Sequence, residues 1–312
     1  MHYSPTPMHI PDGFLTLAVS LICWAVTISL LAIAIRKTNK ELGEKQVPLM
    51  GIMAAFIFAA QMINFPVAGG TSGHLLGGAL AAIVLGPWAA MLVMTSVIAV
   101  QGLLFQDGGL IVMGANILNM GLLTTVVGYG LYRIVSKKSI TTRLVISGMA
   151  AWLSVMTGAL ATAVQLWLSG TAQINIVVPA MLGVHALIGL GEALITVAAL
   201  GFIFRTRPDL LGDGSASAQS GRGWVFAGLL ITLVVVLLSP LASSSPDGLE
   251  RVAEDMGFLN NSQAAPFHII PDYTIPFLGA TPLSTILAGG LGVMVVLGVA
   301  FLVGRSLRIG NQ

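Results

Sequence analysis

Long apolar runs fill most of the chain, and short polar segments separate them. A helix of about 20 apolar residues is long enough to cross the roughly 30 Å hydrocarbon core of a membrane. Seven runs approach or exceed this length. We therefore predict seven clear membrane-spanning helices, at residues 14–35, 47–65, 111–132, 144–168, 178–204, 224–241 and 283–303.

The basic residues lie in four of the polar segments. Of the 14 Lys and Arg residues, 13 fall in segments 36–45, 133–143, 205–222 and 305–308. Cytoplasmic loops of membrane proteins are enriched in Lys and Arg. We therefore expect all four segments to be cytoplasmic, with the N-terminus outside and the C-terminus in the cytoplasm.

This orientation decides how an eighth apolar stretch, residues 74–105, is counted. The number of crossings between the first two basic segments must be even, so this stretch crosses twice or not at all. We predict two crossings, a hairpin bent at Gly86 and Pro87, which gives nine crossings in total. Its first arm, about 12 residues long, is too short for an ordinary span. Such arms occur where protein buries them or where they line a cavity, so this region is a candidate binding site.

A polar stretch divides the chain into two parts. Residues 205–223 are rich in Gly, Ser and Arg, which is typical of a flexible linker, here cytoplasmic. We expect a first part over 1–204 and a second part over 224–312, in which two helices flank an external segment at roughly 242–282. Within that segment, Asp247 as N-cap and Glu250 three residues later predict a short amphipathic helix that docks on another surface.

Composition agrees with the span count. The chain is 56% hydrophobic and 8% charged, whereas soluble domains carry roughly 25% charged residues. The predicted fold class is all-α: a polytopic membrane helical bundle in contact with lipid, with about seven helices in the first part and two in the second. The net charge of +2 without a clustered basic surface indicates no nucleic-acid partner.

Histidines supply the candidate chemistry, because none of the five lies in a predicted cytoplasmic segment. His74 follows a loop rich in glycine, and His9 follows Met8 directly. We expect translation to begin at Met8, which would leave that residue a free α-amine. The amine, the His9 amide nitrogen and the His9 imidazole could then bind one ion in a plane, and another imidazole would complete a square-planar set. That geometry is diagnostic of Ni(II) or Cu(II).

Three motifs resemble a known family. They are MHIPDGFL from Met8, PVAGGTSGHLLGGALAAIVLGPWAAM from Pro66 and QGLLFQDGGLIVMGANILNMG from Gln101. Together they are similar to the NikM/CbiM family, the substrate-binding membrane components of energy-coupling-factor (ECF-type) nickel and cobalt importers. The resemblance covers about 8–204 and implies that Met8, His9 and His74 bind the ion. The segment from Pro246 to Glu250, PDGLE, resembles the small NikN-type component, so the chain looks like a fusion of the two.

The resemblance also implies a function and partners. The chain would be a transport component rather than an enzyme, with no resident cofactor, and its transported ligand would be Ni²⁺ or Co²⁺. It would reside in a prokaryotic plasma membrane with a transmembrane scaffold subunit and two cytoplasmic ATPases. The chain itself has no G-x-x-x-x-G-K-[ST] phosphate loop. The planar nitrogen set favours nickel.

Two alternatives stay open at this point: a cobalt component serving cobalamin synthesis, and an intramembrane metalloenzyme with an external histidine-bound metal. A zinc protease would show H-E-x-x-H, which the sequence lacks. Among the remaining polar residues, we expect Asn116 to orient a ligand imidazole. Glu192, seven residues after His185, could pair with that histidine.

Overall fold

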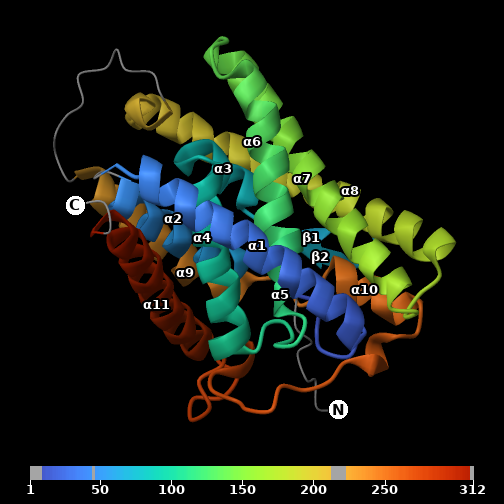
Figure 1. Cartoon of the computed structure of the whole chain (residues 1–312). Helices are drawn as coiled ribbons and strands as arrows, with labels where there is room; N and C mark the ends of the chain where they lie inside the picture. Colours follow the sequence, from blue (N-terminus) through green and yellow to red (C-terminus); the bar gives the residue numbers. More distant parts are fainter. Residues whose placement is uncertain (1–8, 44–45, 212–222, 310–312) are drawn as a thin grey trace.

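The computed structural model describes residues 9–43, 46–211 and 223–309, and it is a bundle of helices (Figure 1). The one small sheet among these residues is a hairpin of β1 (Phe65–Val67) and antiparallel β2 (Thr71–Gly73). The helices of the first part are α1 (Leu17–Glu41), α2 (Gln46–Gln61), α3 (Gly78–Leu85), α4 (Pro87–Val100), α5 (Met113–Asn116), α6 (Thr124–Val135), α7 (Ile140–Leu168) and α8 (Ile174–Thr206). Those of the second part are α9 (Gly223–Leu238), α10 (Gly248–Asp255) and α11 (Pro282–Ile309).

The predicted fold class is confirmed. Six of the described helical segments are long and apolar enough to cross a membrane. Two π-helical stretches lengthen these helices: Gln101–Phe105 continues α4, and Ile117–Leu123 joins α5 to α6. Every run predicted to span the membrane lies mainly in helix, and the chain is a multi-pass membrane protein.

The predicted hairpin at residues 74–105 is present as two helices. α3 ends at Leu85 and α4 begins at Pro87, with Gly86 between them at φ 80°. All eight residues of α3 are buried. At about 1.5 Å per residue this helix is only about 12 Å long, so it cannot cross a bilayer alone. Burial by neighbouring helices satisfies the condition under which a short helix is stable inside a membrane protein.

The second part packs against the first through its two long helices and through the segment between them. α9 and α11 pack against α2, and the segment that connects them, residues 242–281, runs across one end of the bundle (Figure 1). The amphipathic helix predicted there is α10, and Asp247 and Glu250 form the expected capping box. Its apolar face docks as predicted, because Leu249 and Val252 lie in one buried cluster with Ile10 and Phe14.

The stretch predicted as a linker from residue 205 begins as folded structure. α8 continues to Thr206, and Pro208–Leu211 form a 3₁₀-helix. Leu211 is buried, and its carbonyl accepts a 2.7 Å hydrogen bond from the buried guanidinium of Arg143. The rest of the predicted linker, residues 212–222, lies outside the described residues.

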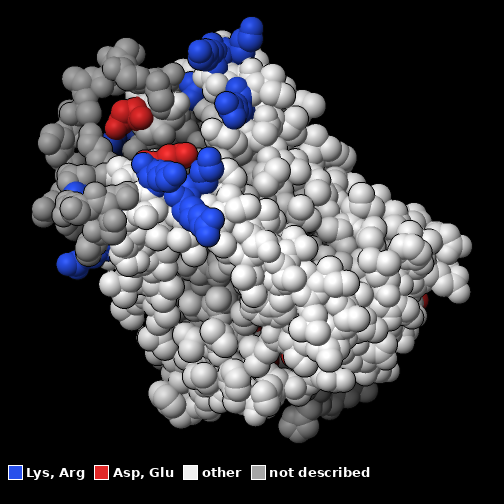
Figure 2. All heavy atoms as spheres, viewed as in Figure 1, with Lys and Arg blue, Asp and Glu red and all other residues white. Residues whose placement is uncertain are grey.

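Charged side chains are unevenly distributed over the surface. On the face shown in Figure 2, Lys and Arg gather at one end of the molecule and the remainder is almost free of charge. Arg251 of α10 departs from the pattern; it forms an ion pair with Asp255 on the same helix. The connecting segment therefore lies apart from most of the basic residues.

Candidate ion-binding site

The N-terminal arm is fixed inside the bundle by a carboxylate. Asp12 accepts backbone hydrogen bonds from Leu110, Ile111 and Val112 at 2.9, 2.9 and 3.1 Å. These amides precede α5, where the first N–H groups of a helix have no partner within the helix. Ile10 adds a backbone bond, its carbonyl accepting from Gly109 at 2.9 Å. The arm is therefore anchored at the position next to His9.

Asn116 acts on the arm backbone rather than on an imidazole. Its amide oxygen accepts from the Ile10 N–H at 3.1 Å, and its amide nitrogen donates to the Ile10 carbonyl at 3.0 Å. The arm also approaches Gly108 closely, where a Cβ would lie 3.0 Å from the His9 Cβ. Asn116 thus clamps the backbone next to His9, and the expectation that it orients a ligand imidazole stays a prediction.

His74 lies between β2 and α3, and two polar groups hold the chain that follows it. The Gln61 side chain donates to the Leu76 carbonyl at 2.8 Å. The carboxylate of Glu192 accepts from the N–H groups of Leu76 and Gly77 at 2.5 and 2.9 Å. Glu192 therefore binds the start of α3, and the suggested pairing with His185 is wrong; the His185 Nδ1 donates to the Met181 carbonyl instead.

The structure brings His9 and His74 together, and we call them the histidine pair. Their ring centroids are 5.6 Å apart and the rings meet edge to face at 65°. Both are buried, at 2% and 6% exposed. With metal–nitrogen bonds of about 2 Å, two imidazoles at this separation can reach one ion.

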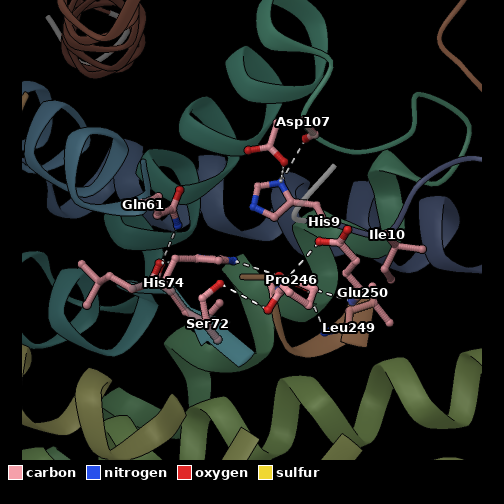
Figure 3. A network of polar contacts seen from close by, with 12 residues as sticks. His9, Ile10, Gln61, Ser72, His74, Asp107, Pro246, Leu249 and Glu250 are labelled. Carbon is pink, nitrogen blue, oxygen red and sulfur yellow. Dashed lines mark hydrogen bonds and ion pairs between the residues drawn. The ribbon is translucent and has the colours of Figure 1, made fainter. Parts of the chain in front are cut away.

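Each ring of the histidine pair has one nitrogen engaged by a carbonyl, and Figure 3 shows the contact of His9 with Asp107. His9 Nδ1 lies 3.0 Å from the Asp107 carbonyl, and His74 Nδ1 lies 3.0 Å from the Leu75 carbonyl. A carbonyl only accepts, so Nδ1 carries the proton in both rings and Nε2 keeps its lone pair. The His9 Nε2 is buried and has no hydrogen-bond partner among the described residues, which is rare for a buried polar atom.

Carboxylates lie beside both rings. Asp107 Oδ1 is 3.6 Å from His9 Nδ1, and Asp247 Oδ2 is 3.8 Å from His74 Nε2. Burial, and then the neighbouring His9, lower the pKa of His74 to about 4. Burial also raises the pKa of Asp247 to about 7. The site thus offers imidazole nitrogens and carboxyl oxygens away from water, a donor set suited to a divalent transition-metal ion.

The second part of the chain contributes to this site through Tyr273. Its hydroxyl donates to Asp107 Oδ2 at 2.8 Å and accepts from the Gln101 side chain at 3.3 Å. Its ring stacks on Phe105 at 4.6 Å between centroids. A residue of the connecting segment therefore positions the carboxylate beside His9.

Sequence reasoning named only part of this arrangement. Met8 lies outside the described residues, and a further external histidine, His268, is exposed. Asp12 and Asp107 were not predicted as site residues, although they stand inside the motifs that begin at Met8 and Gln101. No sequence signal placed Tyr273 near Asp107, since the two are 166 positions apart.

Comparisons with known proteins point to one family. The model described as the cobalt uptake substrate-specific transmembrane region, CbiM, matches residues 9–210, and the PDGLE domain matches residues 222–309. A provisionally named fused nickel transport protein NikMN of Archaeoglobus fulgidus is 34% identical over 96% of this chain and 99% of its own length. The fused nickel transport protein NikMN of Rhodobacter capsulatus is 29% identical over 95% and 97%. A crystal structure of a truncated transition metal transporter is similar at 35% identity and a TM-score of 0.57, over 63% of this chain and 98% of that one.

Proposed function

Because the chain belongs to the CbiM family and carries a PDGLE domain, we propose that it captures Ni²⁺ at the outer face of a membrane for an ATP-driven importer. As a nickel/cobalt transport component, it is not an enzyme. The observation that carries the proposal is the buried histidine pair, whose rings lie close enough to reach one ion.

We assign the ion to the Met8 amine, the His9 amide and imidazole nitrogens, and the His74 imidazole. A chelate that combines the amide and imidazole of one histidine closes through Nδ1. In His9 this atom faces the Asp107 carbonyl, so its ring must turn on binding to release Nδ1 to the ion. His74 needs no such change, since its Nε2 already keeps a lone pair.

Nickel is the proposed ion because four nitrogens in a plane suit Ni(II). Two relatives named as fused nickel transport proteins also match this chain over nearly its full length. Cobalt is the second candidate, since the matching family model is described by cobalt uptake. A titration of the purified full chain with Ni²⁺ in competition with Co²⁺ separates them. Tighter binding of Co²⁺ would overturn the nickel assignment.

We further propose the topology and the partners. The collection of Lys and Arg at one end (Figure 2) supports a cytoplasmic location for that end, in the plasma membrane of a prokaryote. The histidine pair would then face outward, with the chain divided into a binding part over 1–204, a linker over 205–223 and a NikN-like part over 224–312. A transmembrane scaffold and two cytoplasmic ATPases of an ECF-type complex would supply the energy.

The test of this function is uptake of radioactive ⁶³Ni²⁺ by cells that express the chain with its ATPase and scaffold partners. Uptake is expected with active ATPases and is expected to be lost when their phosphate-binding lysine is changed. Equal uptake by cells that contain this chain alone would contradict the ATP-driven importer.

A further inference from the structure

Asp247 divides its two carboxylate oxygens between a helix and the histidine pair. Oδ1 caps α10 and accepts from the N–H groups of Leu249 and Glu250 at 2.9 and 3.0 Å. Oδ2 faces His74 Nε2 at 3.8 Å, which is too long for a hydrogen bond. Asp247 is 6% exposed, so this oxygen is directed at the imidazole in a region largely closed to water.

The position of Asp247 is fixed from several sides. Ser72 of β2 donates through its N–H to the Pro246 carbonyl at 2.8 Å and through its hydroxyl to the Ser245 carbonyl at 2.7 Å (Figure 3). On the other side of Asp247, a Cβ at Gly248 would lie 2.9 Å from Cε1 of His185 on α8. Only glycine allows this close approach. The first turn of α10 is therefore held against β2 and α8, with Asp247 between them.

Asp247 lies near two further carboxyl groups. Burial raises the pKa of Asp247, and the charges of two more carboxyl groups, Glu250 and Asp107, raise it further. Like charges in a buried region repel one another, and burying a charge is costly unless a partner of opposite sign is present. Close by, the His9 Nε2 is buried without a partner. A buried carboxylate beside the Nε2 lone pair of His74 is an arrangement that a divalent cation would relieve.

We propose that Asp247 is part of the ion site: the PDGLE part supplies the carboxylate that attracts the ion to His74 and balances its charge after binding. Before the ion arrives, Oδ2 lies on the Nε2 side of His74. The ion then binds the Nε2 lone pair of His74, with this carboxylate oxygen beside it. This inference rests on the proposed function, and it assigns the second part of the chain a direct role in binding.

The variant Asp247→Asn tests the charge without removing the cap, because Asn is as good an N-cap as Asp. In calorimetric titration of the full chain with Ni²⁺, we expect binding about 10- to 100-fold weaker, the usual effect of removing a group that supports a bound metal. Asp255→Asn is the matched control: it makes the same change on the same helix, at an exposed carboxylate, and should bind as the unaltered protein does. Asp247→Ser, a second neutral capping residue, guards against a defect specific to Asn.

Thermal unfolding separates a charge role from a structural one. Without nickel, both Asp247 variants should unfold at the same temperature as the unaltered protein or higher, since one of three crowded carboxylates is gone. With nickel, their stabilisation should be much smaller. Unaltered Ni²⁺ affinity in both variants, while His74→Ala loses binding, would overturn the role of Asp247 and leave the proposed function standing. Failure of the unaltered protein to bind Ni²⁺ or Co²⁺ would overturn both.

Discussion

His9 and His74 lie side by side, yet the two parts of the chain supply the carboxylates beside them. Asp107, beside His9, belongs to the CbiM part, whereas Asp247, beside His74, belongs to the PDGLE part. His9 is also held within its own part, through the contacts of Asp12 and Asn116. The second part thus lies near His9 through Tyr273, which donates to Asp107, whereas it places a carboxylate of its own beside His74.

This difference predicts how the two parts share the work of binding. Changes on the His9 side should act through the position of the arm, since its anchors are backbone hydrogen bonds. Changes on the His74 side should act through direct contact and charge. Variants on each side of the site test that division.

His74→Ala should weaken Ni²⁺ binding at least 100-fold, a loss of about 2.7 kcal/mol. The variant removes one of the four proposed nitrogens, and no other imidazole is as close to His9 in the described structure. Calorimetric titration of the purified chain measures the effect. His268→Ala, at an exposed histidine, is the control and should bind normally. Undiminished binding by His74→Ala would remove His74 from the site and end the comparison between the two histidines.

Acidification should weaken Ni²⁺ binding next most strongly, by about tenfold or more between pH 8 and pH 6. A free α-amine has an ordinary pKa of about 7.7–8.0, so protons compete for the Met8 amine in this range. Asp247, with a pKa raised to about 7 by burial, loses its charge in the same range. His74, with a pKa lowered to about 4, stays neutral throughout and adds nothing to the loss.

The pH profile of a chain whose N-terminus is acetylated provides the control. Its binding at pH 8 should be weaker, and its pH dependence should be shallower, because the competing amine is gone. If the unmodified chain starting at Met8 bound Ni²⁺ equally well at pH 8 and pH 5, the chelate of amine, amide and imidazole would be wrong.

The sequence predicted the bundle well because its signals are local. Apolar run length located the helices, and Gly86 with Pro87 located the bend between α3 and α4. The capping box of Asp247 and Glu250 was also readable, since its two residues are three positions apart.

The surroundings of the histidine pair were less predictable because they depend on contacts between distant segments. Asp247 lies 173 positions after His74, and only the docking of α10 brings the two together. For Glu192, a local signal gave the wrong partner. Helical spacing suggested a pairing with His185, but the Glu192 carboxylate accepts from two N–H groups just before α3, which have no partner within that helix. Such competition for hydrogen bonds cannot be read from one helix alone.

Asp12→Asn should destabilise the arm and, through it, the site. The carboxylate accepts three backbone hydrogen bonds. In Asn, an NH₂ group replaces one of the two oxygens, and its nitrogen cannot accept a hydrogen bond. Leaving a buried N–H without a partner costs about 1–3 kcal/mol, so the unfolding temperature should fall and Ni²⁺ affinity should drop up to about tenfold. Asp255→Asn should leave both quantities unchanged. A loss of affinity without any loss of stability would contradict a positioning role for Asp12.

Tyr273→Phe should have the smallest effect of the series, about two- to fivefold weaker Ni²⁺ binding. The change removes the hydrogen bond to Asp107 but keeps the ring that stacks on Phe105, and a net hydrogen bond contributes about 1 kcal/mol. Tyr273 acts on His9 only through Asp107, whereas Asp247 faces His74 directly. A loss for Tyr273→Phe as large as that for Asp247→Asn would mean that the PDGLE part acts equally on both histidines, and the division between the two sides of the site would have to be given up.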